Sequence, residues 1–98
     1  MGRVRRPTPA RLPEKLLRIR DALGLSQNGM LRMLGIEEGY DRATISGYER
    51  GVREPPLPVL LEYARAANVY IDALVDDKVD LPKKIPCRRR STGIQQQT

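Results

Sequence analysis

The side chains best suited to chemistry lie in two fragments of the chain, Ser26-Gln27 and Ile45 to Gly51. They carry hydroxyl, amide, carboxylate and guanidinium groups, which form hydrogen bonds readily but need an activating base to react as nucleophiles. The chain contains no histidine, and it has no glycine-rich phosphate-binding loop. Ser26 is therefore interpreted as a helix cap and Ser46 as a surface residue, and both fragments favour ligand recognition over catalysis. We expect neither enzymatic activity nor a cofactor.

Length and composition narrow the class of protein. With 98 residues, the chain is long enough for one small domain. Its single cysteine, Cys87, cannot form an intrachain disulfide or complete a cysteine zinc site, which favours a reducing compartment. No apolar run approaches membrane-spanning length, and no signal peptide is visible at the N-terminus. The sequence therefore predicts a cytoplasmic protein that binds neither metal nor membrane.

The net charge of +6 is unevenly distributed along the chain. Residues 1–11 carry four arginines and residues 83–90 carry five basic residues, with no acidic residue in either segment. Residues 12–82 hold nine basic and all 12 acidic residues, which gives this part a charge of about −3. Basic ends attract nucleic acid or anionic surfaces, but they also serve as solubilising tails. Both interpretations stay open for the two ends.

The helical spacing of the apolar residues predicts five helices, and therefore an all-α fold. The predicted segments run from Pro13 to Leu23, from the N-cap Ser26 to Leu34, from the N-cap Asp41 to Arg50, from Leu57 to Ala67, and from Ile71 to Val75. Residues 1–12 are expected to form an extended basic arm, because they contain prolines and arginines with almost no apolar periodicity. Residues 13–77 form the expected domain, and residues 78–98 are expected to be a flexible tail.

The third predicted helix, Asp41 to Arg50, suits the major groove of double-stranded DNA. Its expected outward side chains are short apart from the arginines, so that the helix backbone can approach the base edges. Arg42 is placed to form a bidentate pair with a guanine, and Ala43 and Thr44 are placed to meet a thymine methyl group. Ser46 can reach a base or a phosphate. This helix is therefore the expected reader of DNA sequence.

Gly47, Arg50 and Arg53 extend the expected DNA-binding surface. A glycine inside a helix costs about 1 kcal/mol relative to alanine, and close approach to DNA is one reason to retain it. Crowding between helices, or simple tolerance of a glycine there, is an equally good explanation, so the role of Gly47 stays open. Arg50 and Arg53 lie at and just beyond the end of the helix, where they can contact phosphates at the rim of the groove.

An ordered set of residues around these fragments carries a family resemblance. The set comprises Leu16 and Arg20, Gly24 to Gln27, Leu34-Gly35, Ile45-Ser46-x-x-Glu49-x-Gly51, Arg53-x-Pro55, and Val69-x-x-Asp72-x-Leu74. Over about residues 13 to 77, the chain resembles the lambda-repressor-like (Xre/Cro-type) helix-turn-helix family. The resemblance implies a five-helix domain that binds specific double-stranded DNA as a transcriptional regulator, and we expect a repressor.

The resemblance also assigns roles to residues outside the third helix. Gln27 matches a glutamine that hydrogen-bonds a DNA phosphate from the start of the second helix, and Asn28 is a second candidate for that contact. Arg20 and Glu49 match a largely buried ion pair that ties the first helix to the helix that reads DNA. Glu49 is therefore expected to be structural rather than a base-reading residue.

Two features depart from the family pattern. Nine residues, Ile36 to Thr44, separate Gly35 from Ile45, which makes the turn longer than usual, and Glu37 to Tyr40 look like the insertion. Leu31 stands where the family usually has alanine, at the crossing of the second and third helices. Because phosphates repel an acidic pair, the turn is expected to point away from the duplex. The longer turn bears on which residues contact bases, and not on the class of protein.

Two kinds of protein partner are also expected. A homodimer on paired half-sites is the usual way for so small a domain to gain specificity. Tyr70, Ile71, Leu74 and Val75 can form an apolar dimer patch, or they can cover the core of their own domain. The alternative is a DNA-binding antitoxin, or another interaction module, whose C-terminal tail binds a partner protein.

Overall fold

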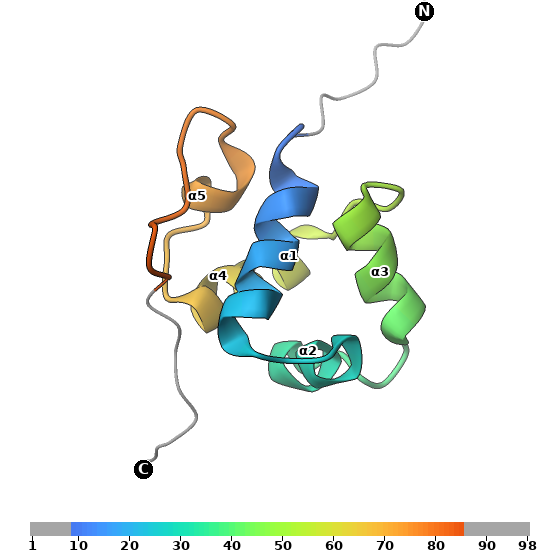
Figure 1. Cartoon of the computed structure of the whole chain (residues 1–98). Helices are drawn as coiled ribbons and strands as arrows, with labels where there is room; N and C mark the ends of the chain where they lie inside the picture. The colour runs from blue at the N-terminus through green and yellow to red at the C-terminus, as the bar shows by residue number, and fades with distance from the viewer. Residues whose placement is uncertain (1–8, 86–98) are drawn as a thin grey trace, which may run out of the picture.

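The computed structural model describes residues 9–85, which form a small all-helical domain (Figure 1). Its helices are α1 (Leu12–Leu23), α2 (Gln27–Leu34), α3 (Arg42–Arg50), α4 (Leu57–Ala67) and α5 (Asp72–Val75). The described residues contain no strand. The predicted all-α, five-helix fold is confirmed, and the helices begin and end within one residue of the bounds expected from the sequence. The remaining residues of the basic arm and of the tail, 1–8 and 86–98, lie outside the described residues.

Short polar side chains begin α2 and α3, and glycines end them. The Ser26 hydroxyl accepts a hydrogen bond from the main-chain N–H of Gly29 at 2.9 Å. The Asp41 carboxylate accepts one from the N–H of Thr44 at 3.3 Å. Each cap satisfies one of the main-chain donors that a helix leaves unpaired at its start. Gly35 and Gly51 follow the two helices with φ angles of 74° and 77°, a conformation that favours glycine.

Helix α1 lies at the centre of the domain. It packs against α3, α4 and α5, whereas α2 packs against α3 and α4 (Figure 1). The core consists of buried aliphatic side chains, small residues and two tyrosines: Leu12, Leu16, Ile19, Met30, Leu31, Leu34, Ile45, Tyr48, Val59, Leu60, Tyr63, Ala64, Ala66, Ala67, Ala73, Leu74 and Leu81. Leu31, the bulky departure from the family pattern, is therefore a core residue. The position and orientation of α3 depend on this packing.

A C-terminal segment, residues 76–85, runs back along α1, and we call it the strap. The guanidinium of Arg18 donates hydrogen bonds to the carbonyl oxygens of Pro82 and Lys83 at 2.6 and 2.8 Å. Leu81 is buried in the core. Residues 78–98 were expected to form a flexible tail, whereas residues 78–85, the part of it that the structure describes, pack on the domain. The packing of these residues has no signal in the sequence, because their polar contacts are made by main-chain carbonyl groups, which every residue carries.

Lys15 of α1 also holds the strap in place. Its ammonium group donates hydrogen bonds to the carbonyl oxygens of Ala73, Asp76 and Val79 at 2.9, 3.0 and 2.6 Å. The side chain is buried, yet its three donors all have acceptors. Burial of a charge is tolerated under this condition, because the carbonyl dipoles replace the lost hydration. Lys15 thus joins the end of α5 and the strap to α1.

Candidate nucleic-acid interface

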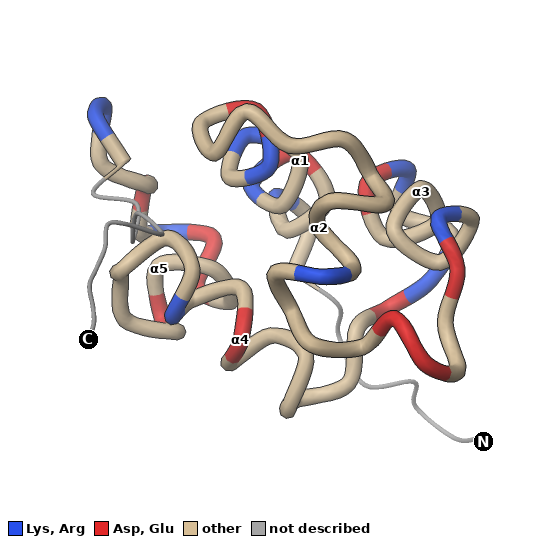
Figure 2. The backbone as a smooth tube through the Cα atoms, turned by 90° about the horizontal axis from the view of Figure 1, so that it is seen from below, with Lys and Arg blue, Asp and Glu red and all other residues tan. Residues whose placement is uncertain are grey.

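The outward face of α3 is polar and carries two arginines. Arg42, Ala43 and Arg50 are exposed, and Ser46 is half-buried. The Nε group of Arg50 donates a hydrogen bond to the hydroxyl of Ser46 at 3.1 Å. Figure 2 shows acidic residues on the turn before α3 and a basic residue where the helix begins. This face therefore offers hydrogen-bond donors and short side chains, with positive charge at both ends of the helix.

Two residues expected on this face are buried. Thr44 is only 6% exposed, and its hydroxyl lies 3.5 Å from the carboxylate of Asp41. It follows Arg42 by two positions, which turns its side chain about 200° around the helix, toward the inner side. Gly47 is buried because the side chain of Arg53 covers it. Neither Thr44 nor Gly47 is exposed for direct contact with a ligand, which makes both unsuited to contact bases.

An ion pair fixes α3 to α1. Arg20 Nε lies 2.7 Å from Glu49 Oε2, and Arg20 Nη2 lies 3.0 Å from Glu49 Oε1, so the pair is bidentate. The side chains of Arg20 and Glu49 are 17% and 6% exposed. Hydrogen bonding to Glu49 raises the pKa of the Arg20 guanidinium above its ordinary value. The expected contact between these two residues is thus present, and it is one of the strong kinds of charged hydrogen bond.

The same pair reaches the start of α2. Arg20 Nη1 donates a hydrogen bond to the carbonyl oxygen of Leu25 at 2.9 Å, and the side-chain amide of Gln27 donates one to Glu49 Oε1 at 3.3 Å. The turn between α1 and α2, the first residue of α2, and α3 are therefore held by one network. Because Gln27 and Asn28 lie in the first turn of α2, they stand beside main-chain N–H groups that helices leave unpaired. Such a position favours an anionic group.

Tyr63 of α4 lies in the core near this network. Its side chain is fully buried, and its hydroxyl has no hydrogen-bond partner within residues 9–85. Burial raises the pKa of Tyr63 well above its ordinary value, with a smaller contribution from the negative charge of Glu49. A buried hydroxyl without a partner is unfavourable for folding.

The turn between α2 and α3 is exposed over its whole insertion. Glu37 to Tyr40 are all exposed, and Gly39 adopts a positive φ of 95°. Figure 2 shows the acidic residues of this turn next to the beginning of α3. The insertion therefore lengthens the turn without changing the cap of α3.

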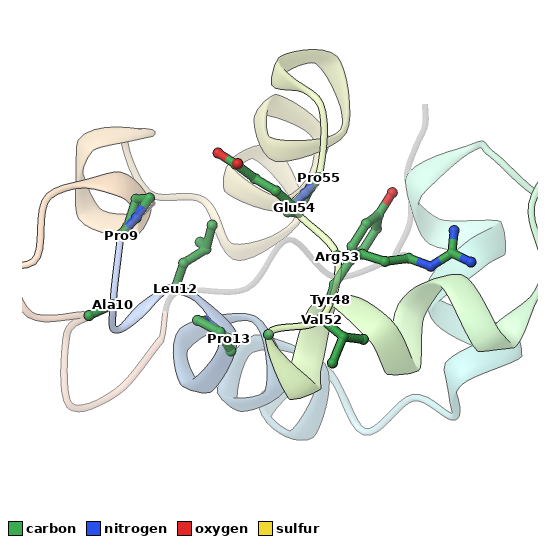
Figure 3. Close-up of a pocket in the computed structure, with 10 residues that line it drawn as sticks. Pro9, Ala10, Leu12, Pro13, Tyr48, Val52, Arg53, Glu54 and Pro55 are labelled. Carbon is green, nitrogen blue, oxygen red and sulfur yellow. The ribbon is translucent and has the colours of Figure 1, made fainter. Parts of the chain in front are cut away.

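A groove of about 460 Å³ separates the beginning of α1 from the end of α3 (Figure 3). It is lined mainly by prolines, other apolar residues and Arg53: Pro9, Ala10, Leu12, Pro13, Tyr48, Gly51, Val52, Arg53, Glu54 and Pro55. In Figure 3 the side chain of Arg53 extends away from the groove and along α3. The sequence predicts that Arg53 lies just beyond the end of the helix, but nothing in the spacing of the residues indicates the direction of its side chain.

Two short helices, joined by a turn and held at a fixed angle by core packing and an ion pair, define a helix-turn-helix domain. A family model described as Helix-turn-helix matches residues 16–74, which is more than half of the chain. The chain belongs to the lambda-repressor-like (Xre-type) helix-turn-helix family, a family of DNA-binding transcriptional regulators. Comparisons with curated proteins and with solved structures found no match.

Within residues 9–85, none of the helices has the length and apolar character needed to cross a membrane. In the same residues, no group of three or more Cys, Asp or Glu side chains is arranged to hold a metal ion.

Proposed function

We propose that the protein is a repressor that reads a specific DNA sequence by placing α3 in the major groove. The observation that carries this proposal is the exposed face of α3, on which Ala43 and Ser46 lie between Arg42 and Arg50. Small side chains let the backbone of a helix approach base edges, and arginine is the residue that most often reads guanine. A repressor needs only to occupy its site, which one DNA-binding domain can do.

Each residue on the outward face of α3 has a proposed contact. Arg42 reads a guanine, Ala43 packs against a thymine methyl group, and Ser46 contacts a base or a phosphate. Arg50 is directed to a phosphate at the end of α3. The proposed readout is thus confined to one side of one helix.

A second set of proposed contacts positions the domain on the DNA backbone. Gln27 and Asn28 hold a phosphate at the start of α2, and Arg53 holds one at the end of α3. The network of Arg20 and Glu49 supports this division, because it sets the distance between the start of α2 and α3. Both carboxylate oxygens of Glu49 already accept hydrogen bonds within the domain. We therefore assign it no base contact.

A homodimer on two half-sites is part of the proposal. Tyr70 is 87% exposed and Val75 is 36% exposed, and Ile71 beside them is half-buried. Leu74 is fully buried in the core of its own domain, so it is excluded from the dimer patch. Exposed apolar side chains of this kind favour association. Because the ligand is DNA, we place the protein in the compartment that contains DNA.

The test is selection of bound duplexes from a random pool, followed by a reporter assay with the selected site. We expect enrichment of one sequence in two symmetric copies, and lower reporter expression when the protein is present. A pool without enrichment would contradict sequence-specific binding, and raised expression would contradict repression. A single unpaired half-site, bound by a monomer, would contradict the homodimer.

The alternative of a partner-binding tail has no specific support within residues 9–85. The described part of the C-terminal segment, the strap, is bound to α1 of its own domain. The tail residues 86–98, on which that alternative depends, lie outside the described residues.

A further inference from the structure

Gly47 lies on the flank of α3, and the side chain of a residue outside the helix covers it. A Cβ atom added to Gly47 would lie 2.9 Å from Arg53 Cδ, 3.0 Å from Cγ and 3.3 Å from Nε. Carbon atoms in van der Waals contact are usually about 3.5–4.0 Å apart. Arg53 therefore occupies the space that a side chain at position 47 would take. Any larger residue at this position must move Arg53.

The main chain of Arg53 is fixed to the same glycine. The carbonyl oxygen of Gly47 accepts hydrogen bonds from the N–H groups of Val52 and Arg53 at 3.0 and 3.2 Å. The left-handed conformation of Gly51 turns the chain so that these bonds can form. Gly47 thus fixes the main-chain position of Arg53 and also leaves the space in which its side chain lies.

The charged end of Arg53 lies along α3. Figure 3 shows its side chain following the helix from the C-terminal end, beside the ring of Tyr48. Arg53 as a residue is exposed, although its Cγ, Cδ and Nε atoms lie over Gly47. The positive charge near Tyr48 opposes the rise in the pKa of Tyr48 that burial causes. Arg53 therefore extends the charged surface of α3 by one residue that the helix itself does not contain.

We infer that Gly47 is a positioning residue, whose missing side chain lets Arg53 lie flat on α3 with its guanidinium aimed at a phosphate beside the major groove. The inference rests on the proposed function. It identifies the residue that positions the arginine of one proposed phosphate contact. A free arginine side chain loses rotamer freedom when it binds, and this loss opposes association. An arginine already held along the helix loses less. Gly47 itself makes no contact with DNA.

The experiment is a double-mutant cycle with Gly47→Ala and Arg53→Ala, measured on the duplex selected by the wild-type protein. Each single variant is expected to weaken binding several-fold, and the double variant is expected to bind as Arg53→Ala does. Arg53→Ala should also make the slope of log affinity against log salt shallower by about 0.9, the value for one phosphate. Gly47→Ala should make the slope shallower in the same direction, whereas a change in stability alone would leave it unmoved.

Arg50 provides a matched control, because it also ends α3 but does not cover Gly47. Losses from Gly47→Ala and Arg50→Ala should add, since the two act independently. Additive losses from Gly47→Ala and Arg53→Ala would overturn the inference, because they would show that Gly47 acts by a contact of its own. Wild-type affinity in Gly47→Ala would overturn it as well.

Thermal unfolding measures the effect of Gly47→Ala on the stability of the fold. We expect the Tm of Gly47→Ala to be equal to or higher than that of the wild type, because alanine favours helix more than glycine. A lower Tm that Arg53→Ala restores would support the steric contact, and a lower Tm that persists in the double variant would contradict it. Failure of the wild-type protein to select any duplex would refute the proposed function itself. The selection with the wild-type protein is therefore done first, before any variant is measured.

Discussion

Among single residues, Glu49 helps to hold α3 in place because its carboxylate has partners on two other elements. Its two carboxylate oxygens accept hydrogen bonds from Arg20 and from Gln27. A family of DNA-binding proteins offers an obvious role for an acidic residue on the helix that reads DNA, which is to accept a hydrogen bond from cytosine. Here the carboxylate faces the interior and is only 6% exposed. Its contribution is therefore to stability and to geometry.

Glu49→Ala should destabilise the fold by about 3 kcal/mol, because it leaves the guanidinium of Arg20 buried without its partner. The measurement is urea unfolding followed by circular dichroism. Glu62→Ala is the control, since Glu62 and Arg65 form an exposed pair at 2.9 Å on α4. An exposed pair contributes about 0–1 kcal/mol. Equal losses from the two substitutions would contradict the structural role of Glu49.

Tyr63→Phe should leave stability unchanged or raise it by about 1 kcal/mol. The substitution removes a hydroxyl that is buried without a partner within residues 9–85, and it keeps the ring that fills the core. Thermal unfolding of the wild-type and variant proteins gives the comparison. A clear loss of stability in the variant would show that the hydroxyl contributes a hydrogen bond to the fold.

The placement of a candidate-site residue was predictable where it depends on that residue's own helix, and not where it depends on a neighbouring segment. Arg42 and Ser46 follow from helical periodicity and from the cap at Asp41. Gly47 and Arg53 are six positions apart, and their contact depends on the turn at Gly51 and on the direction of a long side chain. No periodic pattern encodes such a contact. The sequence therefore left the role of Gly47 open between two explanations.

Among the elements, the beginning of α1 is held by hydrogen bonds to the strap. Arg11, which precedes the helix, makes no side-chain cap, and Asp77 on the strap instead holds the two residues that lead into α1. The carboxylate of Asp77 accepts hydrogen bonds from the main-chain N–H groups of Ala10 and Arg11 at 2.9 and 3.0 Å. Ala10 and Arg11 lie 67 and 66 positions before Asp77 in the chain. The helices were predictable because their signals are local, whereas this contact joins the two ends of the domain.

The strap makes stability depend on pH in the acid range. Hydrogen bonds from the N–H groups of Arg11 and Ala10 lower the pKa of Asp77 below its ordinary value. A lowered pKa in the folded state means that the ionised carboxylate stabilises the fold above the unfolded-state pKa, about 3.9. That contribution is lost as the pH falls through the folded-state pKa. Asp77→Asn should therefore lower the Tm at neutral pH and reduce the loss of Tm below about pH 4.

Thermal unfolding between neutral pH and about pH 2 tests this expectation in an acid range chosen around the ordinary pKa of aspartate. Asp72→Asn on α5 is the matched control, because it changes an exposed carboxylate that does not cap α1. The control should follow the wild-type curve in its acid branch. Parallel acid branches for Asp77→Asn and the wild type would show that the strap does not hold α1 through this carboxylate.

For the whole molecule, the charge balance separates selectivity from general attraction to DNA. Residues 9–85 contain 12 basic and 12 acidic residues, so that the described domain has no net charge. The excess of +6 comes from three arginines in residues 1–8 and three in residues 86–98. A neutral domain with a basic face selects its ligand by contacts at short range, whereas basic ends attract any DNA.

Removal of residues 1–8 and 86–98 should make the slope of log affinity against log salt shallower, by about 0.9 for each phosphate that the arginines neutralise. The ratio of affinities for the selected and a scrambled duplex should change little. Fluorescence titrations over a range of salt concentrations give both quantities. Equal slopes for the two proteins would assign the attraction to Arg42, Arg50 and Arg53 alone.

The central claim is that α3 reads bases, and base-resolved selection with Arg42→Ala tests it most directly. The wild-type protein and the variant are each given the same random pool, and the preference at every base pair is compared. Arg65→Ala, on a helix that packs against α1, α2 and α5, is the control for loss of an exposed arginine. We predict that Arg42→Ala loses preference at one base pair in each half-site, with a cost of about 1–3 kcal/mol there, while the control keeps every preference. A uniform loss of affinity with all base preferences intact would show that Arg42 contacts a phosphate, and it would contradict the proposed reading of DNA by α3.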